Sequence, residues 1–549
     1  MPATYVSNAD TCAASFDEAR KAYAAGDYAA AAEALDQVFA LDTTHAEGLH
    51  LRGLVALGAG DMVSAQDWIE RALEVQTHPV YYNSLCVIQN RSCAFEAAVR
   101  SARQGLALQP EMAVLHYNEG LALQHLGHLE AAAGSYRQAL ALAPEHSAAC
   151  NNLGTILKAL DDVEGAERQY RCAVALEPAN RQSRSNLGHA LLTLGRYDEA
   201  WAYFEDRSAG VMEVGARPSS VSSRLPLPRW EGASAAVFAR SGSAPATAAT
   251  RLLVTHEQGF GDNLQFVRFL PLVLARFSQV GFVCPPALRR LYEHSFGSRW
   301  PGLVMLDTLP EDFGAWDAHC PLLSLPMALG IRLDNLPAER AYLRADEQLA
   351  AGWRARLAAL SGPARPSVGI VWAGGNTGWS ADGARSLAPA QIAPLLSVPQ
   401  VRWVSLQKAD DPAKLADACG NAQLVDWMDE VKNFADTAAL IGALDLVISV
   451  DTSVAHLAAA MGKPVWLLNR FAGCWRWLRG RDDSPWYPSL RLFTQATRGD
   501  WADVLGRVAA ALGHELAGAV SARATGALPQ HAGQPSPGEL IRVDSTVRE

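Results

Sequence analysis

A repeat of 34 residues runs through the N-terminal part of the chain and constrains the fold more than any other feature. Proline closes three successive copies, at Pro110, Pro144 and Pro178, and two earlier copies carry threonine at the same place. Each copy has two stretches of helical periodicity, and a small residue lies 24 positions before its closing residue, where two helices must approach closely. The sequence therefore predicts about six helix–turn–helix units that stack into an α-solenoid over residues 10–212.

This unit resembles the tetratricopeptide repeat, whose arrays bind a protein or a peptide along a concave face formed by the first helix of each unit. Asn118, Asn152 and Asn186 lie 34 residues apart on that helix, so we expect them to form a ladder along the groove. Two interpretations of the ladder remain open. The amides either bind the backbone of an extended peptide, which makes them a peptide groove, or hydrogen-bond locally between neighbouring repeats.

Composition changes on both sides of the C-terminal half. Residues 213–250 contain four prolines among many serines and alanines, and we expect a linker with one docked piece at 227–232. Residues 517–549 are rich in Gly, Pro, Ala and Ser without periodicity, which predicts a disordered tail.

Between the linker and the tail, short β-rich runs alternate with helical stretches. Strands are expected at 252–254, 281–283, 368–372, 402–406, 446–450 and 465–468, with helices such as 263–277 and 433–443 between them. This alternation predicts parallel, doubly wound sheets. A Pro-rich break at 361–366 divides the region into two Rossmann-like halves, residues 251–362 and 363–516, which we expect to face each other across a cleft at the carboxyl ends of their strands.

Composition also excludes several classes of protein. Charged residues are 19% and hydrophobic residues 49% of the 549, which excludes a mainly disordered chain and a coiled-coil rod. The net charge of −10 argues against a dedicated nucleic-acid binder. The nine cysteines form no Cys-x-x-Cys pair, so neither a disulfide framework nor a zinc site is expected. We see no signal peptide and no apolar span, and we therefore expect a cytoplasmic protein without a membrane span.

The first of three motifs at strand ends is Glu-Gln-Gly-Phe-Gly-Asp-Asn-Leu-Gln at 257–265, which follows a strand and opens a helix. Gly259 and Gly261 would let a ligand approach the backbone closely, and Gln265 is grouped with them as a candidate contact to an acceptor. Asp262 lies near the helix N-terminus, where it would either cap the helix or act on a substrate hydroxyl.

The second motif is Trp-Ala-Gly-Gly at 372–375, followed by Asp-Gly-Ala-Arg-Ser at 382–386. It describes a strand and then a Gly-rich loop that begins at Gly374 and ends in a cation. The planar fork of Arg385 suits a diphosphate, and Ser386 follows it directly. A solvated loop arginine is the alternative interpretation.

The third motif, at 445–465, is the strongest of the three. A buried strand ends in Asp451, and Thr452 and Ser453 cap the helix that follows, whose first N–H groups would form an anion site. His456 lies one turn into this helix, where it would contact phosphates or a ribose. The alternative is that His456 is a packed polar residue.

Together these motifs resemble bacterial tetratricopeptide-repeat proteins with a C-terminal GT-B glycosyltransferase region similar to the heptosyltransferases. Protein O-N-acetylglucosaminyltransferases of animals and plants share the same plan. The matching stretches extend over nearly the whole chain and include residues 257–266, 372–374, 405–407, 436–438, 451–458, 475–477 and 484–488. The resemblance implies transfer of a sugar from a nucleotide sugar to an acceptor hydroxyl, with no metal and no further cofactor, and an acceptor protein held by the repeats.

The resemblance also implies roles for single residues. Asp262 matches the catalytic base. The residues expected to bind the donor are Gly374, Arg385, Ser386, Gln407, Asp451, Thr452, Ser453 and His456. One stretch departs from the family: where relatives often carry His-x-Asn-Asp-x-x-Arg-Ser, residues 379–386 read Trp-Ser-Ala-Asp-Gly-Ala-Arg-Ser. Two alternatives therefore remain, a non-catalytic scaffold with a degenerate GT-B region, and a transferase for small molecules or lipid saccharides that uses the repeats only for assembly.

Overall fold

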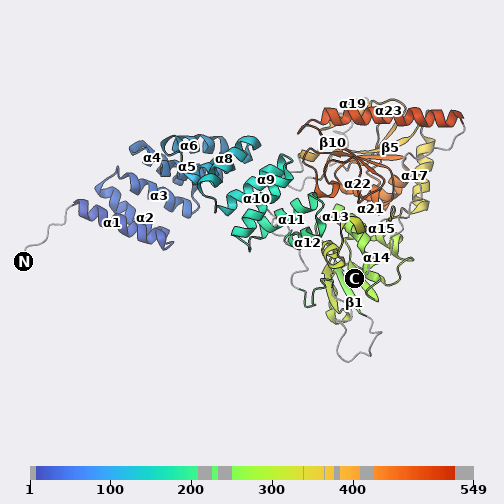
Figure 1. Ribbon diagram of the computed structural model, residues 1–549, viewed down its shortest axis with the longest axis horizontal. Helices are drawn as coiled ribbons and strands as arrows, with labels where there is room; N and C mark the ends of the chain where they lie inside the picture. The colour runs from blue at the N-terminus through green and yellow to red at the C-terminus, as the bar shows by residue number, and fades with distance from the viewer. Residues whose placement is uncertain are drawn as a thin grey trace, which may run out of the picture. The chain divides into compact units, whose positions relative to one another are not determined.

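The computed structural model describes residues 8–207, 225–232, 250–337, 339–363, 365–375, 384–408 and 424–525, with side chains up to residue 515. These residues form two compact units. The first unit extends to Arg344 and also contains residues 460–462 and Phe471–Pro488, and the second contains the remainder from Ala345 onward. Figure 1 shows the helical array of the first unit in blue and cyan, and the α/β elements of both units from green to red.

Twelve helices form the N-terminal array of the described residues, and successive helices pack against each other in six pairs. The pairs are α1 (Asn8–Ala24) with α2 (Tyr28–Leu41), α3 (Ala46–Gly58) with α4 (Met62–Val75), α5 (Pro79–Arg91) with α6 (Phe95–Leu108), α7 (Ala113–His125) with α8 (Leu129–Leu142), α9 (Ser147–Ala159) with α10 (Val163–Leu176), and α11 (Arg181–Thr193) with α12 (Tyr197–Phe204). The predicted α-solenoid of about six units is confirmed. Its predicted end at residue 212 lies outside the described residues.

The turn inside each pair contains one residue with a left-handed backbone. These residues recur at the repeat spacing and are Gly26, Gly60, Cys93, Gly127, Asp161 and Gly195. Glycine adopts this conformation without steric cost, whereas Cys93 and Asp161 hold it with a Cβ atom. In three pairs an aspartate then caps the second helix. Asp27, Asp61 and Asp162 accept hydrogen bonds of 3.0, 3.0 and 2.8 Å from the N–H group three residues ahead.

The small residue of each repeat marks a close contact between the paired helices. A Cβ atom on Gly120 would lie 2.8 Å from the Tyr136 ring, and one on Gly154 would lie 2.7 Å from the Tyr170 ring. Both tyrosines belong to the second helix of the same unit and are fully buried. A larger residue in the small position would therefore separate the two helices.

Four parallel strands form the sheet of the first unit, in the order β3-β2-β1-β4. Its elements are β1 (Arg251–Thr255), α13 (Phe260–Phe266), α14 (Leu270–Leu274), β2 (Gln279–Val283), α15 (Pro286–Phe296), β3 (Leu303–Leu306), β4 (Ala318–Pro321) and α16 (Leu325–Leu329). The direction of strand succession reverses between β1 and β4, which makes the crevice beyond their carboxyl ends the place where such a sheet binds ligands. The single helix predicted over 263–277 is broken into α13, a 3₁₀ turn and α14, because Pro271 cannot donate a helical hydrogen bond.

A piece of the expected linker lies against the edge strand β4. Trp230 N donates to His319 O at 2.8 Å, and His319 N donates to Pro228 O at 3.0 Å. The Trp230 side chain is buried and meets the Phe277 ring edge-on at 5.2 Å. The piece expected at 227–232 therefore satisfies backbone groups that an edge strand would otherwise expose. Residues 213–224 and 233–249 of the predicted linker lie outside the described residues.

Six parallel strands form the sheet of the second unit, in the order β10-β9-β8-β5-β6-β7. Its elements are α17 (Glu347–Ala359), β5 (Ser367–Val371), α19 (Pro389–Leu396), β6 (Arg402–Ser405), β7 (Leu424–Val425), α21 (Phe434–Gly442), β8 (Leu446–Val450), α22 (Ser453–Ala460), β9 (Val465–Asn469), β10 (Leu490–Thr494) and α23 (Trp501–Thr525). Figure 1 shows α19 and α23 on one side of the sheet and α21 and α22 on the other. Counted along the chain, this is the doubly wound order 3-2-1-4-5-6, with its switch point between β5 and β8.

Two predicted boundaries can be compared with these elements. The second unit begins at Ala345, before the division predicted at residue 362, because α17 packs on α21, where a Cβ on Gly442 would lie 3.2 Å from Ala350 Cβ. Helix α23 continues to Thr525, beyond the predicted start of the tail at 517, since this stretch is rich in alanine, the strongest helix former. Residues 526–549 lie outside the described residues. No helix among those described is long and apolar enough to cross a membrane.

Candidate functional site

Two loops meet at the switch point of the second sheet, one after β5 and one after β8. Arg385 Nη1 donates to Asp451 O at 3.1 Å, and Gly374 N donates to Ser386 Oγ at 3.1 Å. A Cβ atom on Gly374 would lie 2.6 Å from Arg385 Nε, so only glycine leaves room for the guanidinium. The structure therefore brings together four residues that the sequence separates into two motifs.

Gln407 connects the same loop to the end of β6. Its Oε1 accepts hydrogen bonds from Trp372 N at 3.3 Å and from Ala373 N at 3.0 Å. These bonds satisfy the backbone N–H groups where the chain leaves β5, and they fix the start of the Gly-rich loop. Residues 376–383 of this loop lie outside the described residues, and they include 379–383 of the stretch that departs from the family pattern.

The start of α22 forms the other side of this switch point. Ser449 Oγ and Thr452 Oγ1 lie 3.0 Å apart, and Ser453 begins the helix, whose first-turn N–H groups have no acceptor within the helix. The His456 side chain is only 5% exposed, and its Nε2 lies 3.7 Å from Asp451 Oδ1. Its burial fits the interpretation of a packed polar residue, and its polar edge nevertheless faces Asp451 at the switch point.

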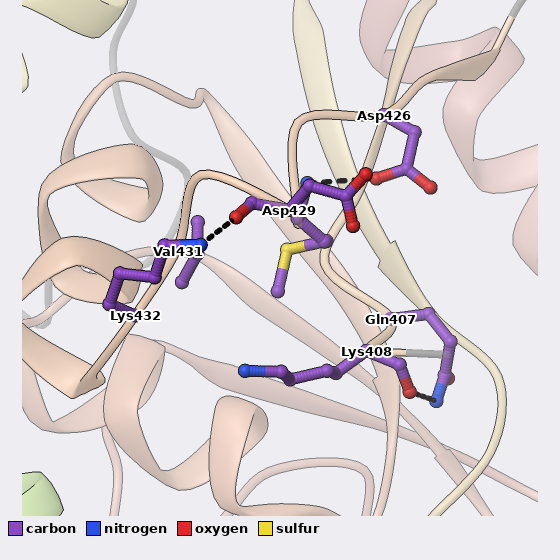
Figure 2. A pocket seen from close by; sticks show the side chains of 7 residues that line it. Gln407, Lys408, Asp426, Asp429, Val431 and Lys432 are labelled. Atoms are coloured by element: carbon purple, nitrogen blue, oxygen red, sulfur yellow. Dashed lines mark hydrogen bonds between the residues drawn. The ribbon is translucent and has the colours of Figure 1, made fainter. Parts of the chain in front are cut away.

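A cavity of about 200 Å³ lies at the carboxyl ends of β6 and β7. Its lining consists of Gln407, Lys408, Asp426, Met428, Asp429, Val431 and Lys432. Figure 2 shows Gln407 and Lys408 on one side of this cavity and Asp426 and Asp429 on another. The lining offers apolar surface for a flat ring, carboxylates for hydroxyl groups and ammonium groups for phosphates.

The segment that carries Asp426 to Lys432 is fixed to α17. Arg356 donates to both oxygens of Glu430, at 2.7 and 2.8 Å. Its guanidinium lies 4.6 Å from the Trp353 ring centre and 4.4 Å from that of Trp427. The hydrogen bonds from Arg356 lower the pKa of the Glu430 carboxyl. This wall of the cavity is therefore held by charge and by ring stacking together.

In the first unit, Asp262 lies in the first turn of α13, beyond the end of β1. Gly259 N donates to Asp262 Oδ2 at 3.3 Å, so the predicted capping contact is present. The second carboxylate oxygen, Oδ1, accepts a hydrogen bond from Arg476 Nη2. The side chain of Asp262 is 17% exposed and that of Arg476 is 13% exposed, so the ion pair is largely buried.

The loop before Asp262 has a constrained backbone. Gln258 has φ of +60°, a left-handed conformation that is costly for a residue with a Cβ atom. The buried Asn263 holds this turn, since its Nδ2 donates to Glu257 O at 3.1 Å and to Gly259 O at 2.8 Å. Gly259 has open space at its missing Cβ apart from Asp262 Oδ2 at 3.6 Å, and Gly261 is the second residue of α13.

Two residues of this site have contacts that the sequence did not reveal. Gln265, expected near an acceptor, is fully buried, and its Oε1 accepts from Arg476 Nε at 2.5 Å. Arg476 itself was not predicted as a site residue. The available signal was the Trp-Arg-Trp stretch at 475–477, which belongs to the family resemblance but suggests no partner for its arginine.

A buried charge network joins the end of the solenoid to the same loop. Arg207, only 4% exposed, donates from Nε to Glu257 Oε2 at 3.2 Å and from Nη1 to Glu205 Oε1 at 3.0 Å. Its Nη2 donates to Ser324 Oγ at 2.9 Å, as does Nη2 of Arg229. Helix α12, the docked linker piece, the loop after β1 and the end of β4 therefore meet in one network.

Aromatic side chains of α12 and of residues 475–486 pack together next to α13. Trp475 contacts Trp201 and Phe204 of α12 with ring centres 6.1 and 6.0 Å apart. Trp486 Nε1 donates to Tyr197 Oη at 2.8 Å, and both side chains are buried. The last helix of the solenoid is thus part of the core that positions Asp262.

The asparagine ladder makes hydrogen bonds between repeats. Nδ2 of Asn118 donates to Asn83 Oδ1 at 2.9 Å, and Nδ2 of Asn186 donates to Asn151 Oδ1 at 2.9 Å. Nδ2 of Asn152 contacts the Tyr117 hydroxyl at 3.3 Å. Each bond reaches the first helix of the preceding unit, which is the local interpretation of the ladder. A peptide-binding role for the same amides stays a prediction.

Known protein families match both parts of the chain. Tetratricopeptide-repeat models match residues 16–79, 113–146 and 151–209. The model of glycosyltransferase family 9 (heptosyltransferase) matches residues 431–468. This second match begins at the cavity wall, includes Asp451, Thr452, Ser453 and His456, and ends in β9.

The chain is also similar to individual proteins. It is 30% identical over 341 residues to Protein FlbA of Caulobacter vibrioides, a match that covers 59% of this chain and 53% of FlbA. The chain therefore spans about half the length of this curated relative. Among solved structures, it is similar to PilF of Pseudomonas aeruginosa, with 15% identity, a TM-score of 0.35 and coverage of 38% of this chain and 95% of PilF. It is similar too to MamA of Desulfovibrio magneticus RS-1, with 19% identity, a TM-score of 0.30 and coverage of 31% and 97%.

The matches and the folds agree on the plan of the chain. The repeat models match the solenoid, and the glycosyltransferase match lies in the second parallel sheet. The chain therefore contains tetratricopeptide repeats followed by an α/β region in which residues 431–468 are similar to the family 9 glycosyltransferases, the heptosyltransferases.

Proposed function

We propose that this chain is a metal-independent glycosyltransferase of the GT-B class that moves a sugar from a nucleotide sugar to an acceptor hydroxyl. One observation carries the proposal. At the switch point of the second sheet, the Arg385 guanidinium lies over Gly374 and bonds the backbone of Asp451, beside the start of α22. A cation and a helix N-terminus together form a site for a diphosphate. The family 9 match at 431–468 supports glycosyl transfer as the chemistry.

The cavity beside this site is proposed to hold the nucleoside of the donor. Gln407 belongs to both, since it bonds the loop after β5 and also lines the cavity. Met428 and Val431 supply apolar surface for a base, and Asp426 and Asp429 can accept hydrogen bonds from ribose hydroxyls. A nucleotide would therefore place its base against β6 and β7 and its phosphates toward Arg385.

The proposed reaction is a direct displacement at the anomeric carbon. The acceptor oxygen forms a bond to that carbon while the bond from the carbon to the diphosphate oxygen breaks, and Asp262 takes the hydroxyl proton. Negative charge develops on the leaving diphosphate, and Arg385 and the N-terminus of α22 stabilise it. These groups supply the positive charge that a metal ion supplies in other transferases, so the proposal needs no metal or other cofactor.

The acceptor is proposed to be a protein or a peptide bound by the repeats. Tetratricopeptide arrays bind polypeptides, and three repeat matches extend over the solenoid. Helix α12 also forms part of the core that positions Asp262, through Trp201, Phe204 and Trp475. A partner bound along the solenoid would therefore be held by the same unit that carries the proposed base.

The first test is a thermal-shift screen of the purified chain against nucleotides and nucleotide sugars with different bases and sugars. A ligand at one hundred times its Kd should stabilise the second unit by about 2.7 kcal/mol. The shift should disappear in Arg385→Ala. It should persist in Arg507→Ala, a matched control whose arginine pairs with Asp503 on α23.

A ligand found in this way is then tested for transfer of its sugar to proteins of a cell extract. Binding without transfer or hydrolysis would contradict the proposed catalysis. Folded protein that binds no nucleotide across the panel would contradict the proposed function as a whole and favour the scaffold alternative, which predicts partner binding without nucleotide-sugar binding.

A further inference from the structure

We propose that Arg476 is the positioning residue for Asp262, and that it orients the carboxylate which takes the proton of the acceptor. This inference rests on the proposed function and adds a residue to it. Both side chains belong to the first unit, although Arg476 follows Asp262 by 214 residues in the sequence. Arg476 reaches this position because the chain leaves β9, adds Phe471–Pro488 to the first unit, and then returns to form β10.

The guanidinium of Arg476 is held in three directions at once. Nη2 donates to Asp262 Oδ1, Nε donates to Gln265 Oε1 at 2.5 Å, and Nη1 contacts Cys474 Sγ at 2.9 Å. Its plane also packs on the Trp475 ring, whose centre is 4.6 Å from the guanidinium carbon. An arginine fork in this arrangement has a fixed orientation, which a point charge on a flexible stem would not have.

Two of the groups that hold Arg476 are themselves buried. Gln265 has no exposed surface, and Trp475 is buried against α12. Gln265 is thus an anchor for the arginine, and it cannot touch a substrate in this conformation. Helix α12 of the solenoid packs against Trp475, Trp475 packs against Arg476, and Arg476 donates to Asp262.

Both oxygens of Asp262 are restrained as a result. Oδ1 accepts from Arg476 and Oδ2 accepts from Gly259 N at 3.3 Å. Each carboxylate oxygen has a further lone pair, so the proton of an acceptor hydroxyl can still be taken in a fixed direction. Arg476 exchanges no proton in this step, because its guanidinium stays charged throughout. Misplacing a base by about 1 Å can slow a reaction about 10²-fold, so the loss of this restraint should appear in kcat.

The test compares Arg476→Gln and Arg476→Lys with Arg479→Gln as a matched control. Arg479 lies on the same segment, three residues further, and pairs with Asp161 and Glu164 on the solenoid. The assay uses the nucleotide sugar found in the thermal-shift panel and measures kcat and KM for this donor by release of the nucleotide.

We expect kcat of Arg476→Gln to fall about 10–10²-fold, with KM for the donor within about twofold of the wild type. Arg476→Lys should recover part of the loss, because it restores a donor and a charge without the fork. Arg479→Gln should stay within about twofold of the wild type in kcat. Near-normal kcat in Arg476→Gln, a change confined to KM, or an equal loss in Arg479→Gln would each overturn the inference. If Arg476→Gln does not fold, the kcat of Arg476→Lys decides by the same criteria.

A second measurement does not depend on turnover. A double-mutant cycle with Asp262→Asn and Arg476→Gln, followed by hydrogen exchange of α13, should show coupling between the two sites of about twofold or more in the opening equilibrium. An active protein without this coupling would overturn the positioning role alone. A coupled pair in a protein that neither binds nor turns over any nucleotide sugar would instead refute the proposed function, and the pair would then be structural.

Discussion

Replacing Arg207 with methionine is expected to destabilise the junction between α12 and the loop after β1 by about 3–5 kcal/mol. Arg207 is 4% exposed, and the carboxylates of Glu257 and Glu205 that it neutralises are 11% and 16% exposed. The substitution keeps an apolar stem of similar length, so the packing around the side chain is largely preserved. The main effect is then that Glu257 loses its partner in a poorly solvated place.

The magnitude follows from this burial. Breaking a buried ion pair by removing one partner leaves an uncompensated charge, which typically costs 3–5 kcal/mol. Glu205 is less affected, since Arg229 also donates to it. A change of this size corresponds to about 10²–10⁴-fold in an opening equilibrium.

Hydrogen exchange measured by mass spectrometry is the suitable assay, because a chain with two compact units has no single free energy of unfolding. Peptides from α12 and α13 should exchange about 10²–10⁴-fold faster in Arg207→Met. Peptides from the second unit report whether the effect is local, and they should be unchanged.

Two further variants test the reasoning. Arg207→Met combined with Glu257→Gln removes both charges, and it should recover a large part of the lost protection. Arg332→Met removes a pair with Asp334 whose side chains are 54% and 71% exposed, and it should cost well under 1 kcal/mol. Unchanged exchange in Arg207→Met, or a double variant worse than the single one, would refute the account of the network.

Three other predictions follow from the structure. Deletion of residues 1–212 should yield an insoluble or unfolded product, because it removes α12 and exposes the aromatic side chains that pack against this helix. Deletion of residues 1–110 removes whole repeats and should leave a folded remainder. Far-ultraviolet circular dichroism of the two products would show the difference. Burial, and to a smaller extent nearby cations, lower the pKa of His189 to about 3, so below about pH 6.5 the unfolded chain binds a proton that the folded chain does not. The free energy of unfolding of the solenoid should therefore fall by about 2 kcal/mol from pH 7 to pH 5. In urea titrations, His189→Asn should lose this part of the pH dependence. Asp262→Asn should slow sugar transfer by about 10²–10⁴-fold while Asp334→Asn does not, and turnover near the wild-type rate would remove Asp262 from its role as the base.

The solenoid was predictable because its information is local and repeated. A turn residue, a small residue and a closing residue recur at one spacing, and each acts within a single helical pair. Gly154 illustrates this, since its missing Cβ makes room for Tyr170 only 16 residues ahead. Because the same pattern recurs, a unit that matches it poorly can still be assigned from the spacing of its neighbours.

The α/β region was predictable in outline and less so in detail. Buried central strands such as β5 and β8 are continuous apolar runs, and the sequence located them. Strand β7 has only two residues and β4 ends in proline, so neither has a recognisable run. Pro271 interrupts the helix predicted over 263–277, because the hydrophobic periodicity of this stretch does not register a missing backbone donor.

Residues of the candidate donor site could be predicted where they follow a predicted strand. Arg385, Asp451 and Gln407 each follow a strand, and parallel strands place their carboxyl ends on one edge of the sheet. The cavity beside Gln407 had no such signal. Its wall depends on Arg356 holding Glu430, a pair 74 residues apart in the sequence.

The sequence by itself determined the repeat, the alternation of strands and helices, and the motifs at the strand ends, because these depend on the spacing of neighbouring residues. Only the tertiary structure decided which distant charges meet. Asp262 pairs with Arg476, which lies 214 residues later, and Glu257 pairs with Arg207, which lies 50 residues earlier. Such pairs are set by the path of the chain between them, and a carboxylate in a motif does not indicate which arginine that path will bring to it.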